Sequence, residues 1–351
     1  MLVTSAVERL RVPTGAERQA ILDGPATPSA FALALQRIEA LHRIEVRETA
    51  PLPSPLAAAR IGFWNAERLK YHGPSVELLR RQNLDALLLC EADLGMARSG
   101  NRHALAALAT ALDSGYVFGV EFVELGLGDA RERDWHRGES NAAGIHGGGI
   151  VSHRPLKRPA LARLETSGRW FDGAFGERRV GGRMALMAEL DVAGTPVLLV
   201  SVHYESHTDP ADRRAQTRAM LDAIDAHALG RPVLIGGDFN TSTFDRPTKE
   251  RPAAVEASLA DDPRRLVDPV RYEPMFDLLG ERGYDWTACN LPLAPTERMR
   301  PDGTPAPPFG KIDWFFARGL RCVEATVLAA VDNRGEALSD HEVLAVTIEP
   351  A

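Results

Sequence analysis

One stretch decides how this chain folds: Val233-Leu234-Ile235-Gly236-Gly237-Asp238-Phe239-Asn240. Its apolar start, residues 233–235, predicts a short buried strand. The two glycines let the backbone turn without a Cβ clash and leave room for another group to approach. If the strand geometry continues, Asp238 and Asn240 emerge on one face, because side chains alternate along a strand. Together they could hold a water molecule, a metal ion or a phosphate oxygen; the alternative is a surface Asx turn.

Composition excludes several classes of protein. With 351 residues the chain could form one large domain or two ordinary ones. Its 44% hydrophobic and 25% charged residues are typical of a soluble globular protein. The net charge of −7 predicts no general attraction to nucleic acids or acidic membranes, although a local basic patch is compatible with it.

Cysteine usage and the N-terminal residues bear on the cellular compartment. Cys90, Cys289 and Cys322 are widely spaced and form no CxxC pair. This pattern argues against a disulfide framework or a zinc knuckle and fits a reducing compartment. We see no signal peptide, and no stretch approaches the roughly 18 apolar residues that a membrane span needs. The sequence therefore predicts a soluble, cytoplasmic protein without a membrane partner.

Residues 1–58 are predicted to form an N-terminal extension with one amphipathic helix. Thr27 and Pro28 are a plausible N-cap and first-turn proline. Behind them an apolar stripe follows at helical spacing and is predicted to face the core: Phe31, Leu35, Ile38 and Leu41. The proline-rich segment 51–55 then breaks the chain, and residues 59–351 are predicted to form the main domain.

The main domain alternates predicted strands and helices. Helices are predicted at residues 75–82, 101–112 and 209–229, and strands at 60–64, 84–90, 116–124, 149–152, 184–190, 196–202, 233–235, 312–316 and 343–348. Four polar side chains follow the apolar runs directly, at the predicted C-terminal ends of strands: Asn65, Glu91, His203 and Asp238. Each one alone is usually only solvated. Four of them together favour an active site carried on a rigid sheet.

The chain resembles the endonuclease/exonuclease/phosphatase superfamily over roughly residues 59–350. That superfamily includes deoxyribonuclease I, exonuclease III-type abasic endonucleases, inositol polyphosphate phosphatases and neutral sphingomyelinases. The matching segments occur in the family's order: Phe63-Trp64-Asn65, Glu91, Gly149 to Pro155, Ser201-Val202-His203, Gly237 to Asn240, Lys311-Ile312-Asp313 and Ser339-Asp340-His341. The resemblance implies an α/β (α+β) fold, a four-layer α/β/β/α sandwich of two mixed, mostly antiparallel sheets.

The resemblance also implies a metal site. Glu91 looks like the principal ligand of Mg²⁺, or of Mn²⁺, with help from Asn65 and Asp340. Oxygen ligands of this kind suit Mg²⁺, which keeps several waters that a substrate phosphate can displace.

Five further residues would carry catalysis by the same resemblance: Asp238, Asn240, His203, Asp313 and His341. Asp238 and Asn240 would orient the attacking water and the phosphoryl group. An aspartate beside His341 would fix its tautomer and raise its pKa, which favours an imidazolium near the phosphate. His203 would bind the opposite phosphate oxygen or assist the leaving group. The sequence leaves open whether Asp238 or a histidine is the general base.

Two segments depart from this pattern. The glycine-rich segment 138–148 carries Asn141 and His146, which we expect to contact substrate unless the segment is a plain connector. The insertion from Thr241 to Gly310 is rich in arginine but interleaved with acidic residues. It could cover the site and choose the substrate, or be a solvated loop.

These features predict a Mg²⁺-dependent phosphoesterase whose partner is a phosphate-ester substrate, with a phosphodiester favoured over a monoester. A DNA or RNA nuclease is one alternative, although net charge does not favour a nucleic-acid partner. A small-molecule phosphatase is another. A non-catalytic binding protein on the same fold is the competing class.

Overall fold

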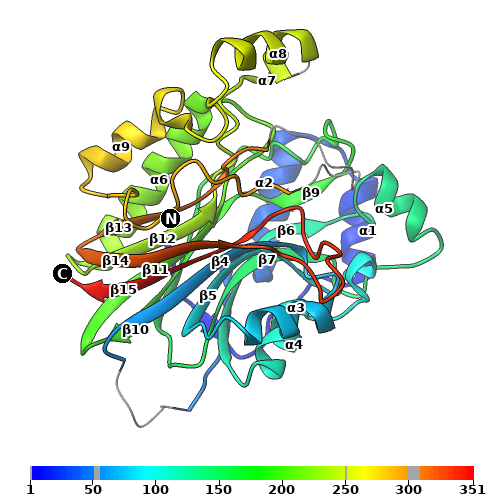
Figure 1. The fold of residues 1–351 in the computed structure, drawn as a ribbon. Coiled ribbons are helices and arrows are strands. Elements are labelled where there is room, and N and C mark those ends of the chain that lie inside the picture. The colour runs from blue at the N-terminus through cyan, green and yellow to red at the C-terminus, as the bar shows by residue number, and fades with distance from the viewer. Residues whose placement is uncertain (1, 51–55, 250, 299–308) are drawn as a thin grey trace.

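The structure, a computed structural model, describes residues 2–50, 56–249, 251–298 and 309–351. In this part of the chain two sheets lie face to face, and helices cover their outer sides (Figure 1). Antiparallel pairs predominate, and the parallel ones are β11–β12, β4–β5 and β2–β3. The predicted four-layer sandwich is therefore confirmed.

The strands form two sheets of unequal size. The first sheet has the order β1 (Leu2–Val3), β8 (Lys157–Arg163), β10 (Met184–Val192), β11 (Thr195–His203), β12 (Val233–Asp238) and β13 (Asp313–Arg318). The second has the order β14 (Leu320–Leu328), β15 (Val343–Pro350), β4 (Ala59–Arg68), β5 (Ala86–Leu94), β7 (Ile145–Ser152), β6 (Gly115–Glu124), β3 (Ile44–Arg47) and β2 (Ala6–Val7), with β9 (Arg179–Gly181) paired to β6.

The helices complete the outer layers. Against the second sheet lie α1 (Gly15–Asp23), α2 (Pro28–Arg37), α3 (His72–Arg80) and α4 (Ala104–Ala111). Helix α5 (Ala130–Trp135) follows β6 and contacts Arg68 and Arg98 through Glu132. Against the first lie α6 (Pro210–Ala228) and α9 (Met275–Glu281), while α7 (Arg246–Lys249) and α8 (Pro252–Asp261) stand apart at the top of Figure 1. In the described part of the chain no helix is both long and apolar enough to cross a membrane.

Strand β12 brings three candidate residues side by side. It pairs in parallel with β11 and antiparallel with β13. In this register His203 lies opposite Asp238, which in turn lies opposite Asp313. The central stretch of the sequence thus fixes three site residues in one row across neighbouring strands.

Gly236 is required by packing between the two sheets. A Cβ atom at this position would lie 2.7 Å from Phe315 Cε1 and 2.8 Å from Leu88 Cδ1, which is closer than carbon atoms approach. We therefore expect Gly236→Ala to lower the free energy of unfolding by about 1–3 kcal/mol through overpacking. Urea unfolding measures this change. Gly280→Ala is the matched control, because a Cβ there meets nothing within 4 Å and helix α9 should gain up to about 1 kcal/mol. Equal effects of the two variants would contradict the packing argument.

The N-terminal residues are more integrated than the sequence suggests. Thr27 caps α2 as predicted, with Oγ1 accepting a hydrogen bond from the N of Ala30. The expectation of a single helix is wrong, because α1 precedes α2, and β1, β2 and β3 join both sheets. A Thr14–Glu17 capping box marks the start of α1 and was the missed signal. The domain boundary at residue 58 stays a prediction, and the proline-rich break at 51–55 lies outside the described residues.

The insertion 241–310 is only partly a surface segment. Helix α9 lies within it and packs against α6, with Phe276 and Leu279 fully buried. Thr296 also belongs to it and accepts hydrogen bonds from the backbone N of Ile312 and of Asp313, both at 3.0 Å. Part of the insertion therefore supports the core and the candidate site, while residues 250 and 299–308 lie outside the described residues.

Candidate active site

Asp238 lies at the end of β12, where four polar groups converge on its carboxylate. Oδ1 accepts a hydrogen bond from the backbone N of Asn240 at 2.9 Å. Oδ2 accepts one from Asn65 Nδ2 at 3.0 Å and lies 3.6 Å from His203 Nε2 and 3.8 Å from His341 Nε2. One oxygen closes an Asx turn, as the alternative interpretation required, but the residue is only 2% exposed. The turn is therefore buried, and the second oxygen faces polar groups from three other elements.

Asn240 owes its position to this turn. Strand β12 ends at Asp238, and Asn240 takes a left-handed φ of 49°. Its Nδ2 donates to the carbonyl oxygen of Tyr204 at 3.0 Å. The condition for Asp238 and Asn240 to share a strand face is thus not met, because β12 ends at Asp238.

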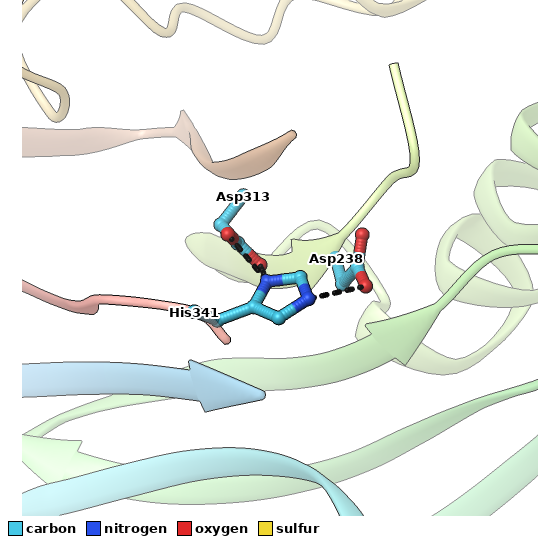
Figure 2. A group of neighbouring side chains, drawn as sticks. All are labelled: Asp238, Asp313 and His341. Carbon is cyan, nitrogen blue, oxygen red and sulfur yellow. Dashed lines mark hydrogen bonds and ion pairs between the residues drawn. The ribbon is translucent and has the colours of Figure 1, made fainter. Parts of the chain in front are cut away.

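His341 is held on both sides by carboxylates. Its Nδ1 lies 2.9 Å and 3.1 Å from the two oxygens of buried Asp313, and Figure 2 shows the ring between Asp313 and Asp238. Burial alone would lower the pKa of His341, but Asp313, then Asp238 and Asp340, outweigh burial and raise this pKa well above its usual value. Burial also raises the pKa of Asp313, to about 6. At neutral pH the geometry therefore favours an imidazolium paired with an Asp313 carboxylate.

The loop that carries His341 is tied to β4. Ser339 Oγ donates to the carbonyl oxygen of Asn65 at 2.7 Å and accepts from the N of His341 at 3.1 Å. Trp64 Nε1 donates to the carbonyl oxygen of His341 at 3.2 Å. Two hydrogen bonds thus join a loop leading to β15 to the strand that supplies Asn65, and the third lies within the loop.

His203 sits in a charged pocket at the end of β11. Arg183 Nη1 lies 2.8 Å from His203 Nδ1 and 3.3 Å from Nε2. The same guanidinium is 3.3 Å from Glu121 Oε2, and its Nε is 3.2 Å from Glu205 Oε2. Burial would raise the pKa of Glu121, yet His203 and Arg183 outweigh burial and lower it. The imidazole is therefore fixed beside Asp238 by a buried cation and two carboxylates.

Asn65 and Glu91 lie inside strands rather than at their ends. The β4–β5 pairing shifts register after Asn65, and β5 shifts against β7 between Leu89 and Ala92. Glu91 sits in that irregularity with a left-handed φ of 54°. Such bulges re-aim side chains, and Asn65 Nδ2 lies 3.4 Å from Glu91 Oε1. The expected strand ends are thus bulges, but the two side chains meet.

Glu91 is an anion held by cations. Arg68 Nη1 lies 3.0 Å from Glu91 Oε2. Burial would raise the pKa of Glu91, but Arg68 and then three histidines outweigh burial, and the pKa lies well below its usual value. A metal ligand must be ionised in this way.

The donor set around Glu91 fits a hard divalent cation. Glu91 and Asp340 offer carboxylate oxygens, the ligand type that Mg²⁺ prefers. Asn65 can add its carboxamide oxygen only after its amide group turns, because Oδ1 accepts from the backbone N of Glu67 at 3.2 Å while Nδ2 faces Glu91. Burial raises the pKa of Asp340 to about 6; His341 opposes this rise, whereas the negative charges of Glu67 and Glu91 add to it. A cation among these carboxylates would relieve that excess of negative charge.

A second group of ligand-type atoms lies next to this set. Within the described residues, ligand atoms of Asp238, Asp313 and His341 lie within 4.8 Å of one another. Both oxygens of Asp313 already contact His341 Nδ1, so a metal ion bound there would compete with that pair. This group is therefore the candidate for proton transfer and phosphate contact, and Glu91, Asn65 and Asp340 are the candidate metal ligands.

Asn141 and His146 are engaged elsewhere. Asn141 Oδ1 accepts from the N of Ala97 at 2.9 Å, and its Nδ2 donates to the carbonyl oxygen of Gly126 at 2.7 Å. His146 is 4% exposed within β7, and its Nδ1 lies 2.9 Å from Asp93 Oδ1. Both side chains hold neighbouring segments together, so we propose no substrate contact for either.

Sequence reasoning missed the charged partners of the site. Arg68, Arg183, Glu121 and Glu205 contact predicted site residues or one another. The signal for Glu121 is its place in the apolar run of β6, because a charge is costly to bury unless it is paired. Arg183 stands just before apolar β10. These positions mark paired charges, but the sequence does not name their partners.

Comparisons with known proteins agree with this geometry. The sequence model described as "Endonuclease/Exonuclease/phosphatase family" matches residues 63–341. No curated protein matches. An endonuclease/exonuclease/phosphatase from Beutenbergia cavernae DSM 12333 is 21% identical with a TM-score of 0.59, covering 84% of this chain and 72% of that chain. The human Nocturnin catalytic domain with bound sulfate is 16% identical with a TM-score of 0.50, covering 88% and 97%. At these identities the likenesses show the fold alone.

The family match spans most of the chain and includes every residue assigned above to the metal and to proton transfer. Members of the family generally use divalent metals, and the oxygen donors around Glu91 fit such an ion. The chain therefore belongs to the endonuclease/exonuclease/phosphatase family, whose members are hydrolases acting on phosphate esters.

Proposed function

We propose that this protein is a divalent-metal-dependent phosphoesterase that hydrolyses a phosphodiester by in-line attack of water. One observation carries the proposal. Asp238 Oδ2 accepts a hydrogen bond from Asn65 and lies within 4 Å of His203 and His341, and Asn65 links it to Glu91. Charge neutralisation, water positioning and leaving-group stabilisation are the tasks of phosphate ester hydrolysis. The residues around Asp238 could supply all three.

Each residue has a distinct task in this proposal. Mg²⁺ or Mn²⁺ held by Glu91, Asn65 and Asp340 would supply positive charge to a phosphate oxygen. Asp238 would orient the attacking water or accept its proton, and Asn240 would orient the phosphoryl group.

The two histidines complete the proposed machinery from opposite sides of Asp238. His341, protonated and held by Asp313, would neutralise charge on the phosphate. His203, fixed by Arg183, would bind the opposite oxygen or assist the leaving group.

A hydrolysis screen tests the function directly. In the presence of Mg²⁺ or Mn²⁺, the protein is assayed for hydrolysis of bis-p-nitrophenyl phosphate, p-nitrophenyl phosphate, plasmid DNA, RNA and sphingomyelin. We expect the diester to be cleaved faster than the monoester, and EDTA to abolish turnover. Faster cleavage of the monoester would favour a phosphatase. Another structural neighbour is named as a phosphatase: the mannosyl-6-phosphatase of Bacteroides thetaiotaomicron VPI-5482. It is 12% identical with a TM-score of 0.50, covering 83% of this chain and 99% of that chain. A folded protein that cleaves no phosphate ester would instead support a binding role.

Duplex nucleic acid is expected to bind weakly and with a shallow salt dependence. The described arginines of the insertion are largely committed within the protein: Arg264 pairs with Asp268, Arg298 with Glu342, and Arg265 stacks on Phe244 and Tyr272. Each neutralised duplex phosphate contributes about −0.9 to the slope of log affinity against log salt.

The measurement is a fluorescence-anisotropy titration of a duplex oligonucleotide with Asp238→Asn protein at several salt concentrations. We expect a slope corresponding to about one or two phosphates. An uncharged peptide nucleic acid of the same sequence is the control for non-electrostatic binding. A slope corresponding to about five or more phosphates would place the nuclease alternative first.

A further inference from the structure

The turn that follows Asn65 has an unusual backbone. Glu67, Arg68 and Leu69 have φ angles of 41°, 70° and 54°, so three consecutive non-glycine residues are left-handed. Side chains with a Cβ atom are disfavoured in this region, and successive cases are rare. Such a turn persists only where the surrounding contacts stabilise it, and strain of this kind is concentrated at functional sites.

This turn places Arg68 between two carboxylates. Its Nη1 lies 3.0 Å from Glu91 Oε2, and its Nε lies 3.1 Å from Glu132 Oε1. Glu132 is anchored on α5, because its Oε2 accepts a hydrogen bond from Arg98 Nη1 at 3.0 Å. Arg98 in turn binds both oxygens of fully buried Asp93 at 2.9 Å. The Glu132 side of Arg68 is therefore fixed to the core, whereas the Glu91 side faces the candidate metal site.

The contact with Glu132 is not an optimal hydrogen bond. Arg68 Nε is buried and finds no hydrogen-bond acceptor of proper geometry among the described residues. The Arg68 and Glu91 side chains remain 21% and 17% exposed. The guanidinium thus donates one hydrogen bond to Glu91 and lies beside Glu132 without a well-formed hydrogen bond to it.

The Glu91 carboxylate cannot fully serve two cations. A divalent ion and a guanidinium on one carboxylate repel each other, and the repulsion is strong in a partly buried site. Without either cation, Glu91 would be a partly buried charge without a counter-ion, which is destabilising. A single cation that stays on Glu91 until a metal ion displaces it avoids both the repulsion between two cations and the cost of an unpaired carboxylate.

We propose that Arg68 is the resident counter-ion of Glu91, and that a divalent metal must displace it towards Glu132 to bind. This inference rests on the metal site assigned in the proposed function. Arg68 is accordingly a positioning residue: its hydrogen bond orients Glu91, and its charge weakens the affinity of the site for metal. Glu132 retains the guanidinium when the metal is bound.

Calorimetric titration with Mn²⁺ alone tests the competition without any substrate. Arg68→Met keeps much of the apolar stem and removes the charge, and we expect its Kd for Mn²⁺ to fall by about tenfold or more. Lys70→Met is the matched control, because it removes a neighbouring unit charge that pairs with Glu67 instead of Glu91. We expect less than about a threefold change for this control.

Several outcomes would overturn the inference. If circular dichroism shows that Arg68→Met is folded, and its affinity for Mn²⁺ is unchanged or weaker than that of wild type, then Arg68 does not compete with the metal for Glu91. An equal gain in Lys70→Met would show a general charge effect. If Arg68→Met does not fold, Arg68→Lys carries the test, because a single ammonium bridges two carboxylates poorly. We expect it to bind Mn²⁺ about two- to fivefold more tightly than wild type, and no gain would overturn the proposal.

The failure of the inference can be distinguished from the failure of the proposed function. If wild-type protein binds no Mn²⁺, or binds it with an affinity that Glu91→Gln does not alter, the metal site itself is refuted. Wild-type protein that binds Mn²⁺ through Glu91, with Arg68→Met unchanged, would remove only the competition.

Discussion

Asp238→Asn is expected to lower kcat by about three orders of magnitude, with the fold retained. A positioned proton acceptor contributes about 10²- to 10⁴-fold to such reactions, and the carboxamide removes it. The amide oxygen can still accept from the N of Asn240, so the Asx turn survives. The new Nδ2, however, would face Asn65 Nδ2, which is itself a donor. We therefore expect the free energy of unfolding to fall by about 1–2 kcal/mol at most.

Steady-state kinetics and urea unfolding measure the two effects separately. Asp172→Asn is the matched control, since Asp172 Oδ1 accepts from the N of Ala174 at 2.9 Å in an exposed turn of the same kind. Its kcat should stay at the wild-type value. If the activity of Asp238→Asn declines only in proportion to the loss of folded protein, Asp238 is a structural turn residue and the proposed mechanism is wrong.

The pattern of apolar residues and glycines along the chain was sufficient to predict strand β12 and the site residue at its end. The apolar run 233–235 is a strand as predicted, and Gly236 and Gly237 leave room for neighbouring groups as predicted. The expected turn at the glycines is wrong, because β12 continues through them to Asp238. The placement of His203 and Asp238 followed because these two strands do end at those residues. In each of these cases the decisive interaction lies within a few residues along the chain.

The bulged strands show where such reasoning stops. Asn65 and Glu91 were expected at strand ends, yet β4 continues to Arg68 and β5 to Leu94. A bulge is a property of the pairing between strands, so neither strand reveals it alone. The ion-pair partners Arg68 and Arg183 were missed for a similar reason, because their contacts depend on register and on packing between segments distant in sequence.

The glycine-rich segment was misinterpreted for a physical reason that applies more widely. The strand was predicted to begin at Gly149, with Gly147 and Gly148 in the segment before it, but β7 begins at Ile145 and contains all three glycines. A Cβ at Gly147 would lie 2.1 Å from the carbonyl oxygen of Gly119, and one at Gly149 2.3 Å from Leu105 Cδ2. These glycines therefore serve close packing in the centre of a sheet. His146 is carried into the core with them, which explains why it is buried.

Glu91→Gln is expected to abolish measurable turnover at low millimolar Mg²⁺ and to weaken Mn²⁺ binding by about 100-fold or more, because the main anionic ligand becomes neutral. Calorimetry and steady-state kinetics measure these losses. Glu45→Gln is the matched control: Glu45 is a buried carboxylate bonded to Tyr116 and His103 in the layer beneath α4, and its loss should affect stability alone. Ordinary turnover in Glu91→Gln would refute the ligand assignment.

Stability is the complication in this experiment, and Arg68 offers the means to separate it from metal binding. In Glu91→Gln the guanidinium of Arg68 retains only Glu132 as an ion-pair partner, so the free energy of unfolding should fall by about 1–3 kcal/mol. The double variant Glu91→Gln/Arg68→Met removes both charges and should regain part of that loss, since adjacent paired residues are non-additive. Metal binding and turnover should stay absent in the double variant, because no carboxylate has been restored. If activity returned together with stability, Glu91 would be a structural partner of Arg68, and the metal would have to bind elsewhere.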